Sequence, residues 1–392
     1  MIKSSDRRMR ATSVFLLASP LGRPGGVQRY TETLTEAFQD LLGRDNVRRI
    51  ELPEAPGQGS ARIPWALKCG FAWRAVWEIV RQRPDLIVCT HLGLAPIGWL
   101  LGKLGRRPYW VVIYGIEAWG RLPTWKASAL RLADRVITIS DFTGEQVSRL
   151  HHVESRRLVT LPGVLDEGLR GASPARDWLS RWSLEGRRVV LTVARLAASE
   201  QYKGHDVVLQ ALPRVLEKVP NLTYLIVGDG DDRPRLEAMA ERLNVKDHVA
   251  FAGSLDMHRE ADKLAACYEA SEVFVLPART VLDERDPKGE GFGIVFLEAM
   301  AFGKPVIGPN NGAPAELIRH GEHGLLVKPE DPAAIAQALI RLLNSPDETR
   351  RMGESASQWV RQKYSYQSLC QRLRALLQGS TTEAPNPVPC GV

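Results

Sequence analysis

Short apolar runs typical of buried strands alternate with amphipathic helical stretches along most of the chain, and this alternation restricts the fold more than any other feature. In the first part of the chain such runs occupy residues 12–18, 86–89, 110–113, 135–139 and 158–161. A glycine-rich loop follows the first run, and residues 27–42 then carry apolar side chains at helical spacing. Strands separated by helices predict a parallel sheet with helices on both faces.

The second part of the chain repeats this pattern. Strand-like runs occupy residues 189–193, 223–227, 249–252, 273–276, 305–307 and 324–327, with helical stretches at 207–218, 233–242 and 332–343. Because 392 residues exceed what one hydrophobic core ordinarily organises, we expect two domains. The predicted fold is α/β, with two doubly wound, Rossmann-like domains facing each other across a cleft.

The predicted domains comprise residues 1–170 and 171–378. We expect the last helix to pack back on the first domain. The final residues, 379–392, are rich in Pro, Thr and Ser and are expected to form a disordered tail.

A glycine-rich turn at Gly289–Gly293 leads into an apolar helix that ends before Pro305. Two carboxylates flank the start of this helix, Glu290 before it and Glu298 within it. Backbone N–H groups at such a turn, together with the helix dipole, attract phosphate. The same pattern also occurs in α/β loops that bind nothing, so its meaning depends on the rest of the chain.

Two cations follow the strand at 189–193, where Arg195 and Lys203 lie in one loop before a helix. Ligands bind at the carboxyl ends of strands in doubly wound sheets, so these cations and the glycine-rich turn are expected at the same edge. A guanidinium and an ammonium together neutralise a diphosphate without a metal ion. Ordinary surface salt bridges are the alternative interpretation of both residues.

Several motifs in this order resemble those of one family. They are Arg195, Lys203-Gly204, Val-Gly-Asp-Gly at 227–230, Glu290 and Glu298 with seven residues between them, and Gly-Lys-Pro-Val-Ile at 303–307. This array closely resembles the retaining glycosyltransferases of family 4, which have the two-domain GT-B fold. The resemblance covers nearly the whole chain, since Gly25-Gly26-Val27 is similar to the family's acceptor-side loop and residues 133–140 to its strand before the crossover.

The resemblance implies a role for each matching residue. Arg195 and Lys203 would hold the diphosphate of a nucleotide-sugar and assist catalysis. Glu290 would be catalytic beside the donor sugar, and Glu298 would accept hydrogen bonds from the ribose hydroxyls. The remaining predicted donor-binding residues are Gly25, Gly26, Gly228, Gly291, Phe292, Gly293 and Ile294.

The acceptor side departs from the family pattern. Many members have a histidine where this chain has Tyr114, and a phenol with a pKa of about 10 is a poor base near neutral pH. Glu117 and His91 are therefore the further candidates for orienting the acceptor, and Glu117 is also counted as a catalytic candidate. A structural role at the end of its strand is the alternative for His91.

No metal ion or other cofactor is expected. Asp229-Gly230-Asp231 has the spacing of a metal-binding Asp-x-Asp, but it follows a strand where Asp and Gly favour a turn. The five cysteines are widely separated and include no Cys-x-x-Cys pair, which argues against a zinc site and suits a reducing compartment.

Positive charge and tryptophan concentrate in the first domain. Residues 1–170 hold 25 Lys and Arg against 16 Asp and Glu, and seven of the ten tryptophans. Residues 62–83 interleave aromatic and basic side chains, which predicts a peripheral contact with an anionic membrane surface. A partly buried helix with a solvated basic face is the alternative.

Together with these observations, the family resemblance implies a retaining, metal-independent hexosyltransferase of the cell envelope. It would move sugar from a nucleotide-diphosphate donor to a glycan or polyprenyl-linked acceptor in surface-polysaccharide synthesis. We expect a cytoplasmic protein, peripheral on the membrane, that binds no nucleic acid. A GT-B nucleotide-sugar epimerase and a non-catalytic basic protein that binds membrane or nucleic acid stay open as alternatives.

Overall fold

The computed structural model describes residues 11–18, 25–52, 65–256 and 259–379. The chain divides into two compact units, one of residues 1–163 with 366–392 and the other of Val164–Ser365. The helix α13 (Tyr366–Leu377) therefore belongs to the first unit, whereas the sequence-based boundaries stood at 170 and 378. The expected tail at 380–392 lies outside the described residues, as do residues 62–64 of the basic, aromatic segment.

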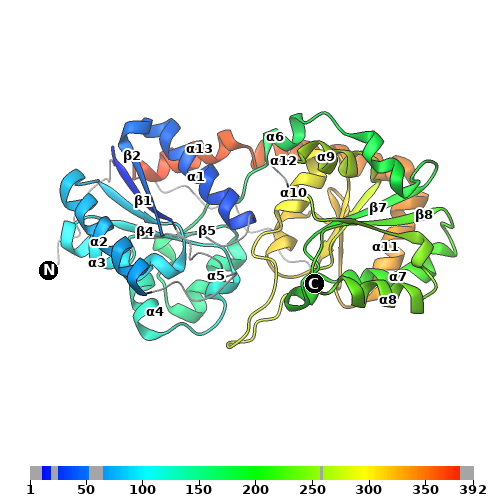
Figure 1. Ribbon diagram of the computed structural model, residues 1–392, viewed down its shortest axis with the longest axis horizontal. Helices are drawn as coiled ribbons and strands as arrows, with labels where there is room; N and C mark the ends of the chain where they lie inside the picture. Colours follow the sequence, from blue (N-terminus) through cyan, green and yellow to red (C-terminus); the bar gives the residue numbers. More distant parts are fainter. Residues whose placement is uncertain (1–10, 19–24, 53–64, 257–258, 380–392) are drawn as a thin grey trace. The chain divides into compact units, whose positions relative to one another are not determined.

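The first unit is built on a parallel sheet with the strand order β2-β1-β3-β4-β5-β6 (Figure 1). Its strands are β1 (Val14–Ala18), β2 (Val47–Glu51), β3 (Leu86–Cys89), β4 (Tyr109–Ile113), β5 (Arg135–Thr138) and β6 (Leu158–Thr160). Its other helices are α1 (Gly26–Leu42), α2 (Trp65–Gln82), α3 (Ala95–Gly105), α4 (Thr124–Arg131) and α5 (Asp141–His151). Five of these strands were predicted to within two residues at each end.

The strand β2 was missed by the sequence analysis. It lies at the edge of the sheet, where it pairs only with β1 among the described strands. Its sequence, Val-Arg-Arg-Ile-Glu, buries Val47 and Ile50 while its arginines and glutamate stay wholly or partly exposed. An edge strand needs few apolar side chains, so this one shows no continuous apolar run.

The helices of the first unit divide between the two faces of its sheet. The chain steps from β1 to β2 in one direction and from β2 through β3 to β6 in the other. Right-handed crossovers therefore place α1 on one face and α2 to α5 on the opposite face. One core cluster agrees with this, because it joins Phe71 and Ile79 of α2, Leu101 of α3, Leu130 of α4 and Val147 of α5.

The second unit has a parallel sheet with the order β12-β11-β10-β7-β8-β9. Its strands are β7 (Arg188–Val193), β8 (Leu222–Val227), β9 (Val249–Gly253), β10 (Val273–Val275), β11 (Val306–Pro309) and β12 (Gly324–Val327). Its helices are α6 (Glu167–Gly171), α7 (His205–Leu216), α8 (Arg233–Arg242), α9 (Ala261–Ala270), α10 (Ile294–Ala301), α11 (Pro332–Asn344) and α12 (Pro346–Lys363). In the described part of the chain, no helix is both long and apolar enough to cross a bilayer.

The direction of strand order in the second sheet changes between β7 and β10. From β7 the chain proceeds outward through β8 to β9, and then returns to lay β10, β11 and β12 on the other side of β7. Loops that follow β7 and β10 therefore diverge at the carboxyl edge and leave a crevice between them. This topology fixes where the second unit can hold a ligand.

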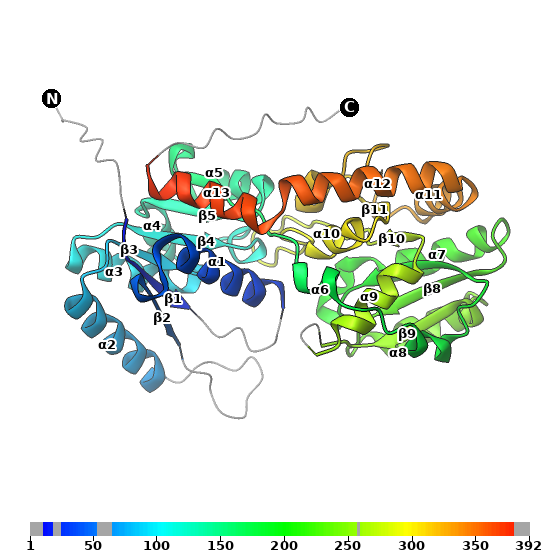
Figure 2. The ribbon, with the colours of Figure 1, turned by 90° about the horizontal axis from the view of Figure 1, so that it is seen from above.

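The helix α13 packs against α1 within the first unit (Figure 2). The Tyr366 hydroxyl donates to Asp40 Oδ2 of α1 at 2.7 Å, and Leu373 is fully buried. More than 300 residues of sequence lie between α1 and α13. The helix α13 can therefore complete the first unit only when the rest of the chain is present.

We expect Leu373→Ala to lower the free energy of unfolding by about 2–5 kcal/mol, because it leaves a cavity in a packed interior. The adjacent exposed Arg374→Ala is the matched control, expected to change stability by less than about 0.5 kcal/mol. Urea titration followed by tryptophan fluorescence measures both. Equal, small effects would show that α13 is not part of the core.

Candidate active site

The two predicted cations lie in the loop that follows β7 and converge on one carboxylate. Arg195 Nη2 lies 2.5 Å from Glu200 Oε1, and Lys203 Nζ lies 3.6 Å from Glu200 Oε2. Both side chains come from residues 194–204, where the turn η6 (Ala198–Lys203) leads into α7. Arg195 is exposed whereas Lys203 is buried, so the loop presents one solvent-exposed and one buried positive group.

The glycine-rich turn that follows β10 meets this loop directly. Lys203 Nζ donates to Glu290 Oε1 at 2.6 Å, which joins the loops on the two sides of the crevice. Gly293 is the N-cap of α10 and has φ +92°, and a Cβ there would lie 2.7 Å from the Phe296 ring. Only glycine suits this position, because both the left-handed backbone and the buried Phe296 ring exclude a Cβ there.

The loops after β7 and β8 are in backbone contact. At Gly228, φ is +149° and a Cβ would lie 1.9 Å from the Ala194 carbonyl oxygen, so no larger residue fits without moving the loop. The Leu196 amide donates to the Asp229 carbonyl at 3.0 Å. Gly228 therefore sets the position of the loop that carries Arg195 and Lys203.

The carboxylates of the Asp-Gly-Asp motif bind backbone amides. Asp231 Oδ1 accepts from Ala198 at 2.8 Å, and Asp229 Oδ1 accepts from Gly230 at 2.8 Å. Across the described ranges, no three His, Cys, Asp or Glu side chains are grouped as metal ligands would be. In the structure, these two carboxylates stabilise the turn that contains them and the neighbouring loop after β7.

Two of the predicted donor-binding side chains are packed into the second unit. Glu298 on α10 is 0% exposed, and its Oε2 accepts from the Tyr268 hydroxyl at 2.8 Å. Phe292 is buried edge-on against Tyr364, with ring centroids 6.0 Å apart. Phe292 thus anchors the glycine-rich turn between Gly291 and Gly293, while ribose binding by Glu298 stays a prediction.

The acceptor-side candidates lie at the carboxyl ends of β3 and β4 in the first unit. His91 Nδ1 accepts from the Gly93 amide at 3.0 Å, and burial and the Lys126 ammonium lower the pKa of His91. Glu117 Oε1 accepts from the Tyr114 amide at 2.5 Å, and burial raises the pKa of Glu117. Both side chains therefore hold their own loops, and any contact with an acceptor stays a prediction.

Tyr114 is buried, and its hydroxyl is 2.9 Å from the Thr31 hydroxyl of α1. Burial raises the pKa of Tyr114, which keeps the phenol protonated near neutral pH. Gly25 and Gly26 begin α1 and are exposed, with Gly25 as the N-cap. The structure thus groups Arg195, Lys203, Glu290 and Gly293 in one unit, and places His91, Tyr114, Glu117, Gly25 and Gly26 in the other.

The sequence analysis missed Glu200, which contacts both cations. The available signal was its position between Arg195 and Lys203, since an acidic residue in a loop with two cations often compensates their charge. It also missed Arg279, whose guanidinium donates to the Gln201 carbonyl at 2.6 Å and ties the loop after β10 to that after β7.

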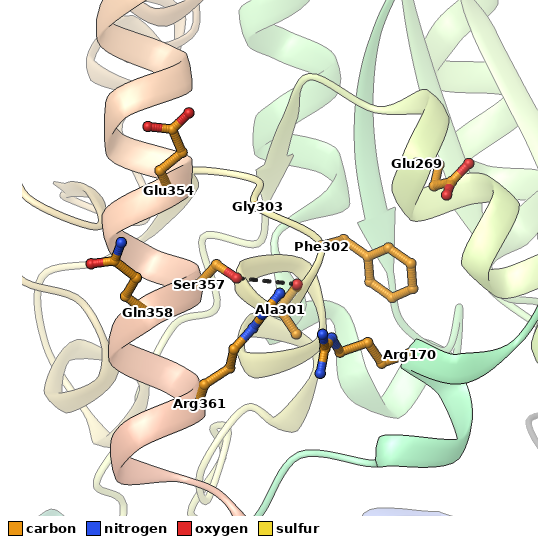
Figure 3. A pocket seen from close by; sticks show the side chains of 9 residues that line it. All are labelled: Arg170, Glu269, Ala301, Phe302, Gly303, Glu354, Ser357, Gln358 and Arg361. Carbon is orange, nitrogen blue, oxygen red and sulfur yellow. Dashed lines mark hydrogen bonds between the residues drawn. The ribbon is translucent and has the colours of Figure 1, made fainter.

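A separate hollow lies beside the C-terminal end of α10 (Figure 3). Its lining includes Arg170, Phe302 and, on α12, Ser357 and Arg361. The Ser357 hydroxyl donates to the Ala301 carbonyl at 3.4 Å, which links α12 to the end of α10. None of the predicted donor-binding residues lines this hollow.

Family models match both units. The description "Glycosyl transferases group 1" matches residues 178–359, and "Glycosyl transferase 4-like domain" matches residues 13–164. The chain belongs to this family of glycosyltransferases, and its two parallel α/β units are those of the GT-B fold.

Named relatives agree with this assignment. The chain is 35% identical over 313 residues to a GDP-mannose-dependent monoacylated alpha-(1-6)-phosphatidylinositol monomannoside mannosyltransferase of Corynebacterium glutamicum, covering 78% of this chain and 79% of that protein. It is 31% identical to the GDP-mannose-dependent alpha-(1-6)-phosphatidylinositol monomannoside mannosyltransferase of Mycolicibacterium smegmatis, covering 73% and 74%. The match to the Mycobacterium tuberculosis protein of that name is 32% identical and covers 67% of this chain and 66% of that one.

Solved structures share the fold at lower identity. HepE of Anabaena, in complex with UDP, superposes with a TM-score of 0.74 at 20% identity, covering 93% of this chain and 99% of that one. Sucrose-phosphate synthase of Thermosynechococcus elongatus gives a TM-score of 0.71 at 22% identity, covering 93% and 98%.

We expect Glu200→Gln to strengthen binding of a nucleoside diphosphate by about tenfold, since one removed charge near two cations is worth on the order of 1.4 kcal/mol. Calorimetric titration with GDP and UDP measures the dissociation constants. Glu237→Gln is the matched control, because Glu237 also pairs with an arginine but lies on α8. Unchanged or weaker binding by Glu200→Gln would mean that its carboxylate does not compete with the ligand.

Proposed function

We propose that this glycosyltransferase transfers a sugar from a nucleoside-diphosphate donor to a lipid-linked acceptor, with retention of anomeric configuration and without a metal ion. The observation that carries the proposal is the convergence of Arg195, Lys203 and the glycine-rich turn at the carboxyl edge of one sheet. Three relatives are named as GDP-mannose-dependent enzymes acting on phosphatidylinositol monomannosides. GDP-mannose and an envelope glycolipid are therefore the first substrates to test.

The electrostatics of the site suit departure of a diphosphate. As the glycosidic bond breaks, negative charge grows on the leaving phosphate, and fixed cations stabilise that charge more strongly than they stabilise the ground state. Lys203 is held in place by Glu290 and by burial, so little reorganisation accompanies the reaction. Arg195, the amides from Phe292 to Ile294, and Gly291 supply further donors to the phosphate and sugar.

In this proposal, Glu290 lies beside the donor sugar, where its carboxylate stabilises positive charge on the anomeric carbon. The acceptor hydroxyl attacks from the face that the diphosphate leaves, and the departing phosphate oxygen takes its proton. Glu298 receives the ribose hydroxyls, Gly228 positions the cation-bearing loop, and Gly25 and Gly26 contribute amides. His91, Tyr114 and Glu117 shape the acceptor side, with Glu117 acting through the loop that it holds.

Lys203→Met should lower kcat/KM by about 10²–10³-fold, because it removes a fixed cation that stabilises the leaving group. Arg195→Met should cost less, since its exposed guanidinium is screened by solvent. Initial rates at several donor concentrations test both variants. Full activity of Lys203→Met would overturn the assigned role.

Neither EDTA nor added Mg²⁺ should change the rate, since Arg195 and Lys203 can take the place of a metal ion at the diphosphate once Glu200 has released them. The product should keep the anomeric configuration of the donor sugar, which NMR of the product reads from the one-bond coupling between C1 and H1 of the transferred sugar. Loss of activity in EDTA with recovery in Mg²⁺ would contradict metal independence, and an inverted product would contradict retention.

The proposal extends to location and to the alternatives. We place the enzyme in the cytoplasm, peripheral on the membrane where lipid-linked acceptors reside. A nucleotide-sugar epimerase of the same fold would alter the donor without any acceptor. Incubation with donor alone, followed by chromatography of the nucleotide-sugar, distinguishes the two because a transferase returns the donor sugar unchanged.

A further inference from the structure

The outer side of α2, α3 and α4 exposes a set of large apolar residues that the donor site does not use. We call this set the tryptophan face, and it consists of Trp73, Trp77 and Val80 on α2, Trp99, Leu100 and Leu104 on α3, and Trp125 with Leu132 on and after α4. Trp73 is 74% exposed and Trp125 is 58% exposed, which is unusual for a side chain of this size.

These residues share one surface because the three helices share one face of the sheet. On α2, Phe71, Ala75 and Ile79 are buried in the core cluster, while Trp73, Trp77 and Val80 recur on the opposite side at helical spacing. The helix α3 packs beside both α2 and α4, as Figures 1 and 2 show. The sequence pattern indicated only the α2 part of this surface.

A cation accompanies a tryptophan on each of the three helices. The Arg81 guanidinium lies 5.0 Å from the Trp77 ring, Lys103 Nζ lies 5.3 Å from the Trp99 ring, and Lys126 Nζ lies 5.4 Å from the Trp125 ring. Further Lys and Arg on these helices are Lys68, Arg74 and Arg131, all exposed, against a single acidic residue, Glu78.

This combination selects among possible occupants. Two copies of the face would bring like charges together, which opposes self-association through it. Single-stranded nucleic acid would stack on the tryptophans, but it gives no favourable environment to Val80, Leu100, Leu104 and Leu132. An anionic bilayer accommodates all three groups, since apolar side chains enter the acyl boundary, indoles remain among the headgroups and cations meet lipid phosphates.

We propose that the tryptophan face docks on the surface of an anionic phospholipid bilayer. The purpose that we assign to this docking rests on the proposed function, because an enzyme docked on the membrane encounters a lipid-linked acceptor within the plane of the bilayer. The evidence for the docking surface comes from the first unit alone.

The test is flotation of the full chain with vesicles of phosphatidylcholine alone or with one third phosphatidylglycerol. The unaltered chain should float with the anionic vesicles at low salt, and less with neutral vesicles or at high salt. The variant Trp73→Gln, Trp77→Gln, Trp99→Gln and Trp125→Gln should reduce the bound fraction by about tenfold. The matched control is Trp178→Gln with Trp182→Gln, a pair that also lies beside an arginine but in the second unit.

A second variant, Arg81→Glu with Lys103→Glu, is used if the tryptophan variant fails to fold, and circular dichroism checks the fold of each protein. Binding of GDP, and transfer to a detergent-dispersed acceptor, should be unchanged in both variants, whereas transfer to acceptor in anionic vesicles should fall. No flotation of the unaltered chain, or equal flotation of every variant, would overturn the proposal. Flotation without binding of any nucleotide would instead refute the proposed function and leave the docking surface standing. Loss of a dimer in the variants, without loss of flotation, would assign the face to a second copy.

Discussion

The ammonium of Lys203 is the group around which the second unit's site is arranged. A buried charge is unfavourable unless it is paired, and Lys203 is paired with Glu290 across the crevice and approached by Glu200 from its own loop. With Arg195 included, two cations meet two carboxylates, so the cluster is formally neutral before a ligand arrives. A diphosphate entering there would add negative charge to a balanced set. The arrangement therefore favours release of Glu200 from the cations when phosphate binds.

The positions of the side chains in this cluster are fixed by close contacts between backbone segments. Gly228 lets the loop after β8 contact the loop after β7, and Asp231 holds the Ala198 amide, so the segment with both cations is fixed at two points. Arg279 fixes it at a third by binding the Gln201 carbonyl. The turn at Gly293 is anchored by Phe292 against Tyr364. Several weak contacts thus maintain a geometry that no single strong bond provides.

The sequence predicted the parts of this architecture that follow from periodicity. Buried parallel strands are continuous apolar runs, so β3, β4, β7 and β8 were found. The edge strand β2 was not found, because Arg48 and Arg49 interrupt its pattern. At the site, the cations and glycines could be recognised from the sequence as motifs. The role of Glu200 could be recognised only from its distances to Arg195 and Lys203. The tryptophan face was seen only in part, because exposure depends on how neighbouring helices pack.

The assignment of α13 to the first unit has a consequence for synthesis. That unit is discontinuous, since residues 164–365 are inserted between its sheet and its last helix. A ribosome working from the amino end completes the whole second unit before the helix that covers α1 emerges. Until then, Leu34 and Phe38 of α1 belong to a nascent unit that lacks one of its helices. The two units therefore complete their folding in a fixed order, and the unit whose translation begins first is the last to be completed.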